Sequence, residues 1–205
     1  RIFCNPAKDN VIVCPPTYGM YEVSAAINDI SIIKVPLHSS FHLDVEGILE
    51  SQNSYSKLLF ICSPNNPTGN SFHLEEVELL IQKFKGIVVI DEAYINYSKQ
   101  QSFIRLLPEY ENLVVLQTFS KAWGLAGLRV GMAYASELII DYLNKVKPPY
   151  NINQASQQLL LNALDNLDWV NTHIKSTIKE RELLKEEIKQ LSFAEKIYES
   201  DANFI

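Results

Sequence analysis

Five short, predominantly apolar runs, most of them rich in β-branched residues, recur along the chain. They lie at residues 11–13, 30–35, 58–62, 87–91 and 114–118. A strand that is buried on both faces has this pattern, whereas a strand with one solvated face alternates apolar and polar positions. The runs therefore predict buried strands in a largely parallel sheet.

Segments with helical periodicity lie between and after these runs. In residues 74–84, Leu74, Val77, Leu80, Ile81 and Phe84 recur at helical spacing. Strands that alternate with helices are typical of an α/β fold. After Pro148 and Pro149 the periodicity predicts helices at 154–164 and 169–191, the second rich in Lys and Glu at spacings that permit i,i+4 pairs.

The composition is that of a globular domain. The chain has 205 residues, of which 47% are hydrophobic, which is ample for a buried core. The 18 basic residues are scattered and outnumbered by 24 acidic ones, so the chain lacks the basic stripe that nucleic acids require. The apolar runs are too short to span a bilayer and no signal-peptide pattern opens the chain, so we expect a soluble, intracellular protein.

The cysteines and histidines show no metal-ligand spacing. Cys4, Cys14 and Cys62 are odd in number and lie in or beside apolar stretches, which favours reduced, buried thiols in a reducing compartment. The four histidines match no catalytic pattern, and His38 and His42 are expected to face solvent in a loop. We assign no metal.

Polar residues follow three of the predicted strands. Asn66 lies in Ser-Pro-Asn-Asn-Pro-Thr-Gly at 63–69, Asp91 and Tyr94 lie in Asp-Glu-Ala-Tyr, and Lys121 follows Thr-Phe-Ser. They are about 25 to 30 residues apart, roughly one βα repeat each. Ligands of open parallel sheets bind beyond the carboxyl ends of the strands, so these positions are the candidate site.

These motifs, in this order and spacing, resemble those of the fold-type I pyridoxal-phosphate-dependent aminotransferases. The resemblance extends from Pro-Pro-Thr-Tyr-Gly at 15–19 to the helices beyond residue 150. Within that superfamily, residues 63–69, Ser-Lys-Ala-Trp-Gly-Leu-Ala-Gly-Leu-Arg-Val-Gly at 120–131 and Lys-Pro-Pro-Tyr-Asn at 147–151 are most similar to the histidinol-phosphate aminotransferase family. Members of that family exchange an amino group between histidinol phosphate and 2-oxoglutarate in histidine biosynthesis.

The resemblance implies pyridoxal 5'-phosphate (PLP) as the cofactor and assigns catalytic roles to Lys121, Asp91 and Tyr94. The ε-amine of Lys121 would form a Schiff base with the cofactor aldehyde and, once displaced, move the substrate proton. Asp91 would form an ion pair with the protonated ring nitrogen. Taken singly, a helix N-cap for Asp91 and a solvated loop residue for Lys121 are the ordinary alternatives.

The remaining cofactor contacts follow from the same resemblance. Asn66 and Tyr94 would hold the phenolate oxygen with an amide and a phenol. The phosphate would bind hydroxyls and a guanidinium, and the ring would stack on an aromatic side chain; the matching residues are Thr118, Ser120, Arg129 and Tyr18. Glu92 is interpreted as a turn or supporting residue, and Tyr150 and Asn151 as residues near the substrate or a neighbouring subunit.

The same family pattern predicts the organisation of the chain and its partners. We expect residues 1–150 to form the large PLP-binding domain and residues 151–205 to form linking helices and the start of a smaller α+β domain. The family's upstream phosphate loop, its C-terminal substrate-binding arginines and a tyrosine from the other subunit have no match here, so both ends are expected to be incomplete. A cytoplasmic homodimer that acts on a small-molecule amino donor and a 2-oxo acid is expected.

Other functions remain open at this point. An aromatic aminotransferase or a threonine-phosphate decarboxylase would share Lys121, Asp91 and Asn66 and would differ in the substrate pocket. A non-catalytic PLP sensor domain of a transcription regulator would carry an added helix-turn-helix, for which these 205 residues show no pattern. A purely structural α/β module would require the whole residue set to be coincidence.

Overall fold

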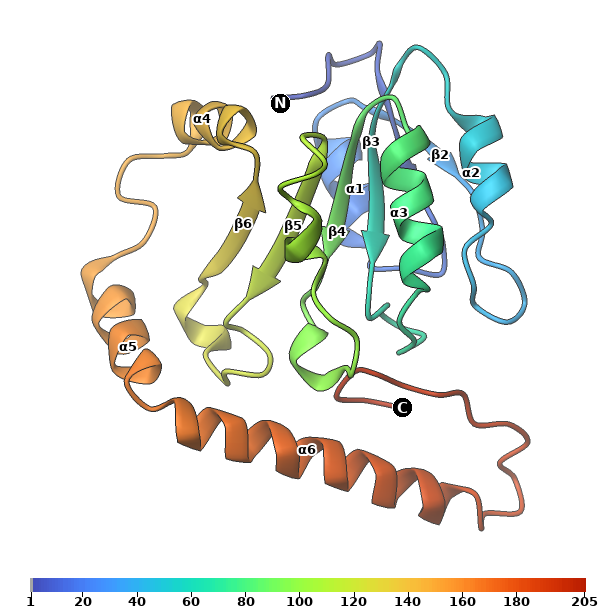
Figure 1. Ribbon diagram of the computed structural model, residues 1–205, viewed down its shortest axis with the longest axis vertical. Coiled ribbons are helices and arrows are strands. Elements are labelled where there is room, and N and C mark those ends of the chain that lie inside the picture. Colours follow the sequence, from blue (N-terminus) through green and yellow to red (C-terminus); the bar gives the residue numbers. More distant parts are fainter. Residues whose placement is uncertain (1) are drawn as a thin grey trace.

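One six-stranded sheet organises the molecule in the computed structural model, which describes residues 2–205 (Figure 1). The strand order is β2-β1-β3-β4-β5-β6. Neighbouring strands run parallel from β2 to β5, and β6 runs antiparallel to β5. The strands are β1 (Asn10–Val13), β2 (Ser31–Lys34), β3 (Ser56–Cys62), β4 (Ile87–Asp91), β5 (Leu113–Thr118) and β6 (Gly131–Ala135).

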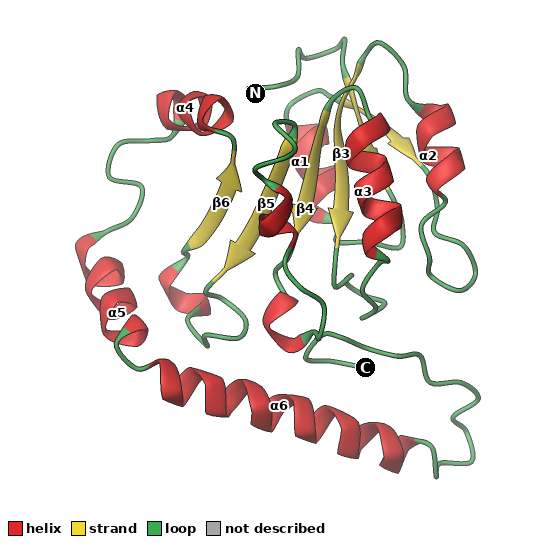
Figure 2. Ribbon diagram, in the orientation of Figure 1, coloured by secondary structure: helices red, strands yellow, loops and turns green. Residues whose placement is uncertain are grey.

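Helices cover the two faces of the sheet and then lead away from it, as the red segments of Figure 2 show. The α-helices are α1 (Met20–Ile27), α2 (Val45–Ser51), α3 (Leu74–Lys83), α4 (Glu137–Val146), α5 (Gln154–Leu164) and α6 (Leu167–Ile188). Three short 3₁₀ helices are η1 (Ile95–Tyr97), η2 (Phe103–Leu106) and η3 (Ala126–Leu128).

Alternate residues of each strand enter two separate cores, because successive side chains of a strand point to opposite faces. On one face, Ile90 packs in a cluster with residues of α2, α3 and η2. On the other face, Val11 packs with Ala25 of α1, and Val89 packs with Ile139 of α4. The sheet is therefore the middle of three layers, and Asp91 and Glu92 leave β4 toward opposite layers.

The five predicted strands are confirmed within one or two residues, and a sixth was missed. β6 has the sequence Gly-Met-Ala-Tyr-Ala, which contains none of the β-branched residues that marked the others. Helices α1, α2 and α4 were also missed, since α1 and α2 are only 8 and 7 residues long. The helix predicted at 154–164 is confirmed by α5, and that at 74–84 by α3 with one residue fewer.

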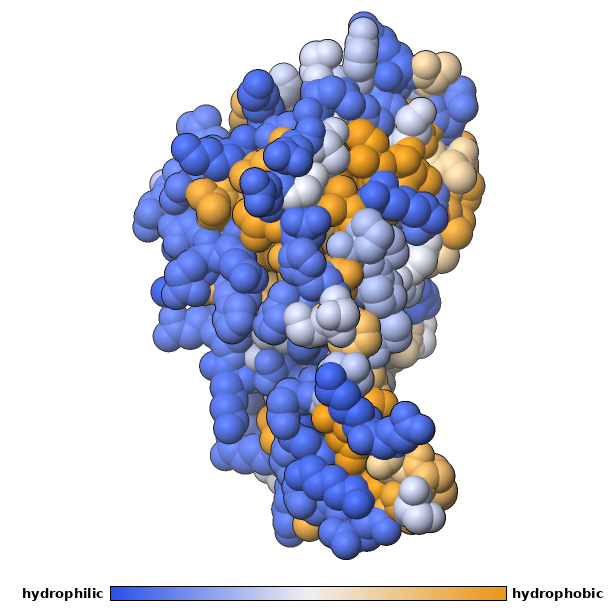
Figure 3. All heavy atoms as spheres, turned by 90° about the vertical axis from the view of Figure 1, so that its right-hand side faces the viewer, coloured by the Kyte–Doolittle hydropathy of each residue, from blue (hydrophilic) through white to orange (hydrophobic). Residues whose placement is uncertain are grey.

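The prediction that residues 30–35 form a buried strand is wrong in its burial. Ser31 and Lys34 are exposed and Ile32 and Ile33 are only half-buried, because β2 pairs with β1 alone and ends the sheet. The side of the molecule that carries β2 and α2 faces the viewer in Figure 3, where hydrophilic residues predominate and apolar ones form one group in the upper half and a smaller one near the lower end.

The long C-terminal helix begins and ends earlier than predicted. It spans Leu167–Ile188 in place of 169–191. Along the helix and its C-cap, Lys185 with Glu182 and Lys189 with Glu186 are i,i+3 ion pairs, and Arg181 pairs with the adjacent Glu182. None of the helices in residues 2–205 combines the length and apolar character needed to cross a membrane. Cys4, Cys14 and Cys62 are free and buried, as predicted.

Candidate active site

A cavity of about 330 Å³ opens at the carboxyl ends of the central strands. β3, β4 and β5 are parallel, so the residues that follow them meet at one edge of the sheet. The eight residues that the sequence predicted for the site all line this cavity, together with Cys62, Ala93, Leu116 and Gln117; the eight are Tyr18, Asn66, Asp91, Tyr94, Thr118, Ser120, Lys121 and Arg129.

Asp91 lines the cavity from the end of β4, where it is paired in register with Cys62 of β3 and Leu116 of β5. Its Oδ1 accepts a hydrogen bond from the backbone N–H of Ala93 at 3.0 Å. Burial raises the pKa of the Asp91 carboxyl, while hydrogen bonds from Tyr21 and Ala93 and the positive charge of Lys121 oppose this rise. The carboxylate retains acceptor capacity for a donor that enters the cavity.

Tyr21, on α1, is a site residue that the sequence did not reveal. Its hydroxyl donates to Oδ2 of Asp91 at 2.7 Å, and its ring stacks on Phe60 with centroids 4.9 Å apart. Burial, together with nearby Asp91, raises the pKa of Tyr21, so it remains a donor. The signal available in the sequence was its position three residues after Tyr18, which places both rings on one side of the start of α1.

Asn66 and Tyr94 form a polar pair on the wall of the cavity. The amide nitrogen of Asn66 donates to the Tyr94 hydroxyl oxygen at 3.2 Å. Tyr94 is 6% exposed and belongs to a buried cluster, whereas Asn66 is half-buried in the loop after β3. Because Asn66 is the donor in this bond, the phenolic proton of Tyr94 and the second amide proton of Asn66 are free to bind a ligand oxygen.

Lys121 extends into the cavity from the turn after β5. Its side chain is exposed, and its Nζ lies 5.2 Å from the centroid of the Tyr94 ring, a cation–π distance. Within residues 2–205 the ammonium has no carboxylate within ion-pair distance. An amine held in this way is accessible to a ligand that enters the cavity, and its charge contributes to the environment of Asp91.

Thr118, Ser120 and Arg129 line the cavity from the segment that connects β5 to β6. The Thr118 hydroxyl oxygen accepts the Ser120 backbone N–H at 3.0 Å, and Arg129 Nη1 donates to the carbonyl of Ala126 at 2.9 Å. Arg129 adopts φ 56° and ψ 42°, a left-handed conformation that is uncommon outside glycine and is concentrated at functional sites. Two hydroxyls and a guanidinium are suited to a phosphate group.

Tyr18 is 44% exposed and lines the cavity from the loop before α1. Tyr150 and Asn151, by contrast, are not brought to this cavity. Tyr150 is 96% exposed, and Asn151 lines a different depression beside α4. The expectation that these two residues approach the substrate therefore has no support from the contacts within residues 2–205.

Glu92 lies on the opposite face of the sheet and supports the cavity from outside. It is 1% exposed and accepts hydrogen bonds from Ser102 Oγ at 2.6 Å, Phe103 N at 2.6 Å and Gln117 Nε2 at 2.8 Å. Burial raises the pKa of its carboxyl, and the three bonds oppose that rise. Because Gln117 also lines the cavity, Glu92 fixes one of its walls.

The histidine prediction is correct for His38 and wrong for His42. His38 is exposed, whereas His42 is half-buried, with its ring stacked on that of His73 at 5.2 Å and its Nδ1 buried without a partner among the described residues. The difference arises because His42 directly precedes Leu43, which is buried in the core. In residues 2–205 no group of three potential metal ligands is found.

The fold and the cavity define the class of protein. The family model described as aminotransferase class I and II matches residues 1–205, so the chain belongs to that family. Histidinol-phosphate aminotransferases of Cytophaga hutchinsonii and Flavobacterium johnsoniae are each 51% identical to it over 205 residues. These matches cover 100% of this chain and 59% of each relative, so the chain spans less than two thirds of their length.

A solved structure supports the fold independently. The histidinol-phosphate aminotransferase of Clostridium acetobutylicum superposes with a TM-score of 0.88 at 22% identity, covering 95% of this chain and 60% of that one. The chain thus shares its fold with that solved structure.

Proposed function

We propose that the protein of which this chain forms at least a part is a PLP-dependent aminotransferase that moves an amino group between histidinol phosphate and 2-oxoglutarate. Its membership of the class I and II family and the 51% identity to two histidinol-phosphate aminotransferases support this function. The observation that carries the proposal is the cavity at the strand ends, which brings together a carboxylate, an amide, a phenol, an amine, hydroxyls and a guanidinium.

These residues fit PLP group by group. The Asp91 carboxylate suits a protonated ring nitrogen, and the paired donors of Asn66 and Tyr94 suit a phenolate oxygen. Thr118, Ser120 and Arg129 suit the phosphate. When bound, PLP supplies an electron sink for the bonds at the substrate's α-carbon.

Three residues of the chain would then have separate roles in the reaction. The Asp91 carboxylate, which accepts a hydrogen bond from the Tyr21 hydroxyl at 2.7 Å, would balance the charge of a protonated ring nitrogen. Lys121 would supply the amine for the cofactor aldehyde and the base that accepts and returns the substrate's proton. Arg129 would hold the phosphate and thereby help to position the cofactor.

The identity of the substrate and the assembly are the finer parts of the proposal. We propose a homodimer in the cytoplasm; the three free, buried cysteines are consistent with a reducing compartment. We also propose that residues 1–150 belong to the large, cofactor-binding domain and residues 151–205 to the linking helices and the start of a small domain. In support, α5 and α6 lie outside the three layers of the sheet (Figure 1).

The cofactor assignment is tested by reducing the PLP-loaded intact protein with borohydride and mapping the labelled peptide. We expect the label on Lys121, and the Lys121→Ala variant should lose the label and lower kcat by roughly 10²- to 10⁴-fold. Lys99→Ala is the matched control, because Lys99 is exposed and makes no contact with the cavity. Label on another lysine, or no label, would contradict the proposal.

The substrate is tested separately with the same preparation. Histidinol phosphate and 2-oxoglutarate should yield glutamate, with phenylalanine and tyrosine as competing donors. Release of carbon dioxide in place of glutamate would support a decarboxylase, and PLP binding without turnover would support a sensor domain.

A further inference from the structure

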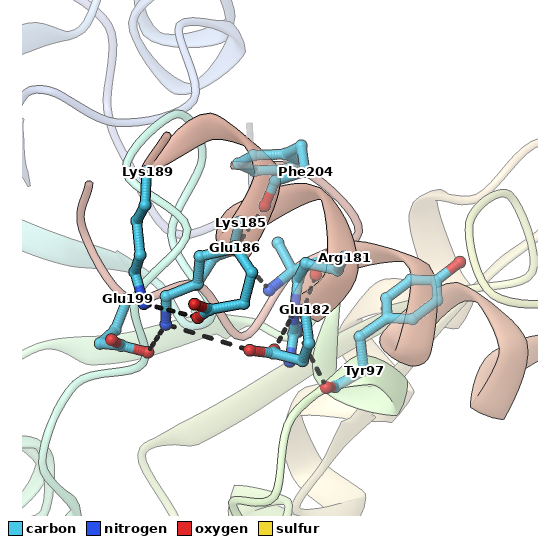
Figure 4. A network of polar contacts seen from close by, with 10 residues as sticks. Tyr97, Arg181, Glu182, Lys185, Glu186, Lys189, Glu199 and Phe204 are labelled. Carbon is cyan, nitrogen blue, oxygen red and sulfur yellow. Dashed lines mark hydrogen bonds and ion pairs between the residues drawn. The ribbon is translucent and has the colours of Figure 1, made fainter. Parts of the chain in front are cut away.

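Helix α6 carries a buried arginine next to the candidate active site. Only 8% of the Arg181 side chain is exposed. Its Nη1 donates to the carbonyl of Ala202 at 2.8 Å and, at 3.4 Å, to the carbonyl of Tyr97, at the end of η1 (Figure 4). Its Nε and Nη2 face the half-exposed carboxylate of Glu182, both at 2.9 Å. One guanidinium therefore joins α6 to two segments that are distant in the sequence.

One of these segments, residues 199–204, returns from α6 to the sheet and is called the return segment here. The backbone N–H of Asp201 donates to the carbonyl of Gly69 at 2.7 Å. A Cβ at Gly69 would lie 2.5 Å from the Ser200 hydroxyl oxygen, so glycine is required for this close approach. The return segment is therefore held both by α6 and by the loop that carries Asn66.

The return segment contacts the residues that line the cavity. The Phe204 ring meets the Tyr94 ring edge to face, with centroids 5.3 Å apart and planes at 89°. Ala202 is 1% exposed and packs with Tyr94, Tyr97 and Ala122, the neighbour of Lys121. Two members of the buried cluster around Tyr94, Tyr97 and Ala202, thus accept hydrogen bonds from Arg181.

Lys185, one turn further along α6, makes the corresponding outer contact. Its Nζ forms an ion pair with Glu199, whose side chain is 85% exposed, and lies 3.9 Å from Glu182. This pair joins the mostly buried ammonium of Lys185 to an exposed carboxylate and fixes only the beginning of the return segment. Figure 4 shows Arg181 and Lys185 on the same side of α6, which makes Lys185 a matched comparison for Arg181.

We propose that Arg181 is a positioning residue for Tyr94 and Lys121, and that it acts through Ala202 and Phe204 of the return segment. The planar guanidinium suits this role, because it presents several N–H donors in fixed directions and reaches two carbonyls at once, whereas an ammonium is a point charge. The inference rests on the proposed function, since Tyr94 and Lys121 serve the reaction only if they bind PLP.

The first measurement is hydrogen exchange in the PLP-free intact protein, on peptides that cover residues 199–204. Loss of the guanidinium leaves the Ala202 carbonyl unpaired, so Arg181→Met should raise the exchange rate of this segment by about tenfold or more. Lys185→Met should raise it less than about threefold, because the ion pair that is lost holds only Glu199, the first residue of the segment, whose own side chain is exposed.

The second measurement is the absorbance of bound PLP as a function of pH, together with steady-state kinetics. Arg181→Met should shift the pH midpoint of the absorbance change and lower kcat roughly tenfold while KM stays within about twofold, since Arg181 lies outside the cavity lining. Arg181→Lys, which keeps the charge and one donor, should be intermediate. Phe204→Leu, which keeps the apolar contact but removes the ring edge, should shift the midpoint in the same direction.

The outcomes separate this inference from the proposed function. Failure of the wild-type protein to bind PLP would overturn both. The positioning role alone would be overturned by a different result. In that case the wild type binds PLP, and Arg181→Met exchanges faster yet keeps the wild-type absorbance and kcat. If Arg181→Met does not fold, the Arg181→Lys and Phe204→Leu variants test the positioning role instead. Wild-type absorbance and wild-type kcat in both of these variants would overturn the proposal.

Discussion

Two carboxylates follow one another at the end of β4 and have opposite surroundings. Asp91 lies on the α1 face, where Tyr21 and Ala93 donate to it and its remaining acceptor capacity faces the cavity. Glu92 lies on the η2 face, where the protein itself provides three donors and only 1% of the residue is exposed. Burial raises the pKa of both carboxyls.

The difference teaches how to distinguish a binding carboxylate from a structural one. A buried carboxylate is costly unless it is hydrogen-bonded, and Glu92 meets that cost with groups of its own chain. The two donors of Asp91 offset the cost of burying its carboxylate only in part, and the carboxylate can still accept a cationic partner. The local motif is the same for both, so the functional role follows from the face of the sheet on which each residue lies.

The largest expected effect is at Asp91. Asp91→Asn should lower kcat/KM for amino transfer on the order of 10³-fold, because the neutral amide cannot stabilise a protonated ring nitrogen. The steady-state kinetics of the PLP-loaded protein measure this effect. Asp141→Asn, an exposed position on α4, is the control and should leave kcat/KM unchanged.

The same variant should not lower the stability of the PLP-free protein at neutral pH. The folded-state pKa of Asp91 is raised above the unfolded value of about 3.9, so its contribution to stability is complete below that value and is lost as pH rises through the folded pKa. Above that pKa the ionised carboxylate costs stability, and Asp91→Asn removes this cost. Urea unfolding at several pH values measures it; a variant that is less stable only at neutral pH would contradict it.

Glu92 should show the reverse behaviour. Glu92→Ala leaves the donors of Ser102, Phe103 and Gln117 without their acceptor and should lower the free energy of unfolding by about 3 kcal/mol. Glu92→Gln, which retains the shape, should cost less. Urea unfolding of the PLP-free protein measures both variants, and kcat/KM per folded molecule should remain within roughly tenfold of wild type. A loss of activity as large as that of Asp91→Asn would break the comparison.

Tyr21 should have a smaller effect that acts through Asp91. The Tyr21 hydroxyl stabilises the ionised carboxylate, so Tyr21→Phe raises the pKa of Asp91 further. The acid limb of the kcat/KM profile should therefore move to higher pH, with a loss of about tenfold at neutral pH. Tyr55→Phe, an exposed tyrosine, is the control, and an unmoved acid limb in Tyr21→Phe would show that the two side chains are not coupled.

The smallest effect concerns Cys62, the register neighbour of Asp91 on β3. Burial raises the pKa of its thiol to about 12, so the thiol is neutral and unreactive although it lines the cavity. Peptide mapping after treatment with a thiol reagent at pH 8 should find Cys62 unmodified in the native protein and modified in urea. Rapid labelling in the native state would show that water reaches the thiol beside Asp91.

Sequence patterns were sufficient for the features that depend on neighbouring residues. Apolar runs located five of the six strands, and the motifs located eight of the twelve residues that line the cavity. The patterns were insufficient where the element is short or lies at an edge: β6 has no β-branched residue, and β2 resembles a buried strand although it ends the sheet.

By itself, the sequence determined the α/β class and the positions of five strands, because hydrophobic periodicity is a local property of a chain, and its motifs determined the candidate PLP residues through their family resemblance. Only the tertiary structure determined which polar groups form hydrogen bonds to these residues and to their neighbours. Tyr21 meets Asp91 across 70 positions of sequence and Arg181 meets Tyr97 across 84. Such contacts depend on strand order and on the packing of helices against the sheet, which no local pattern encodes.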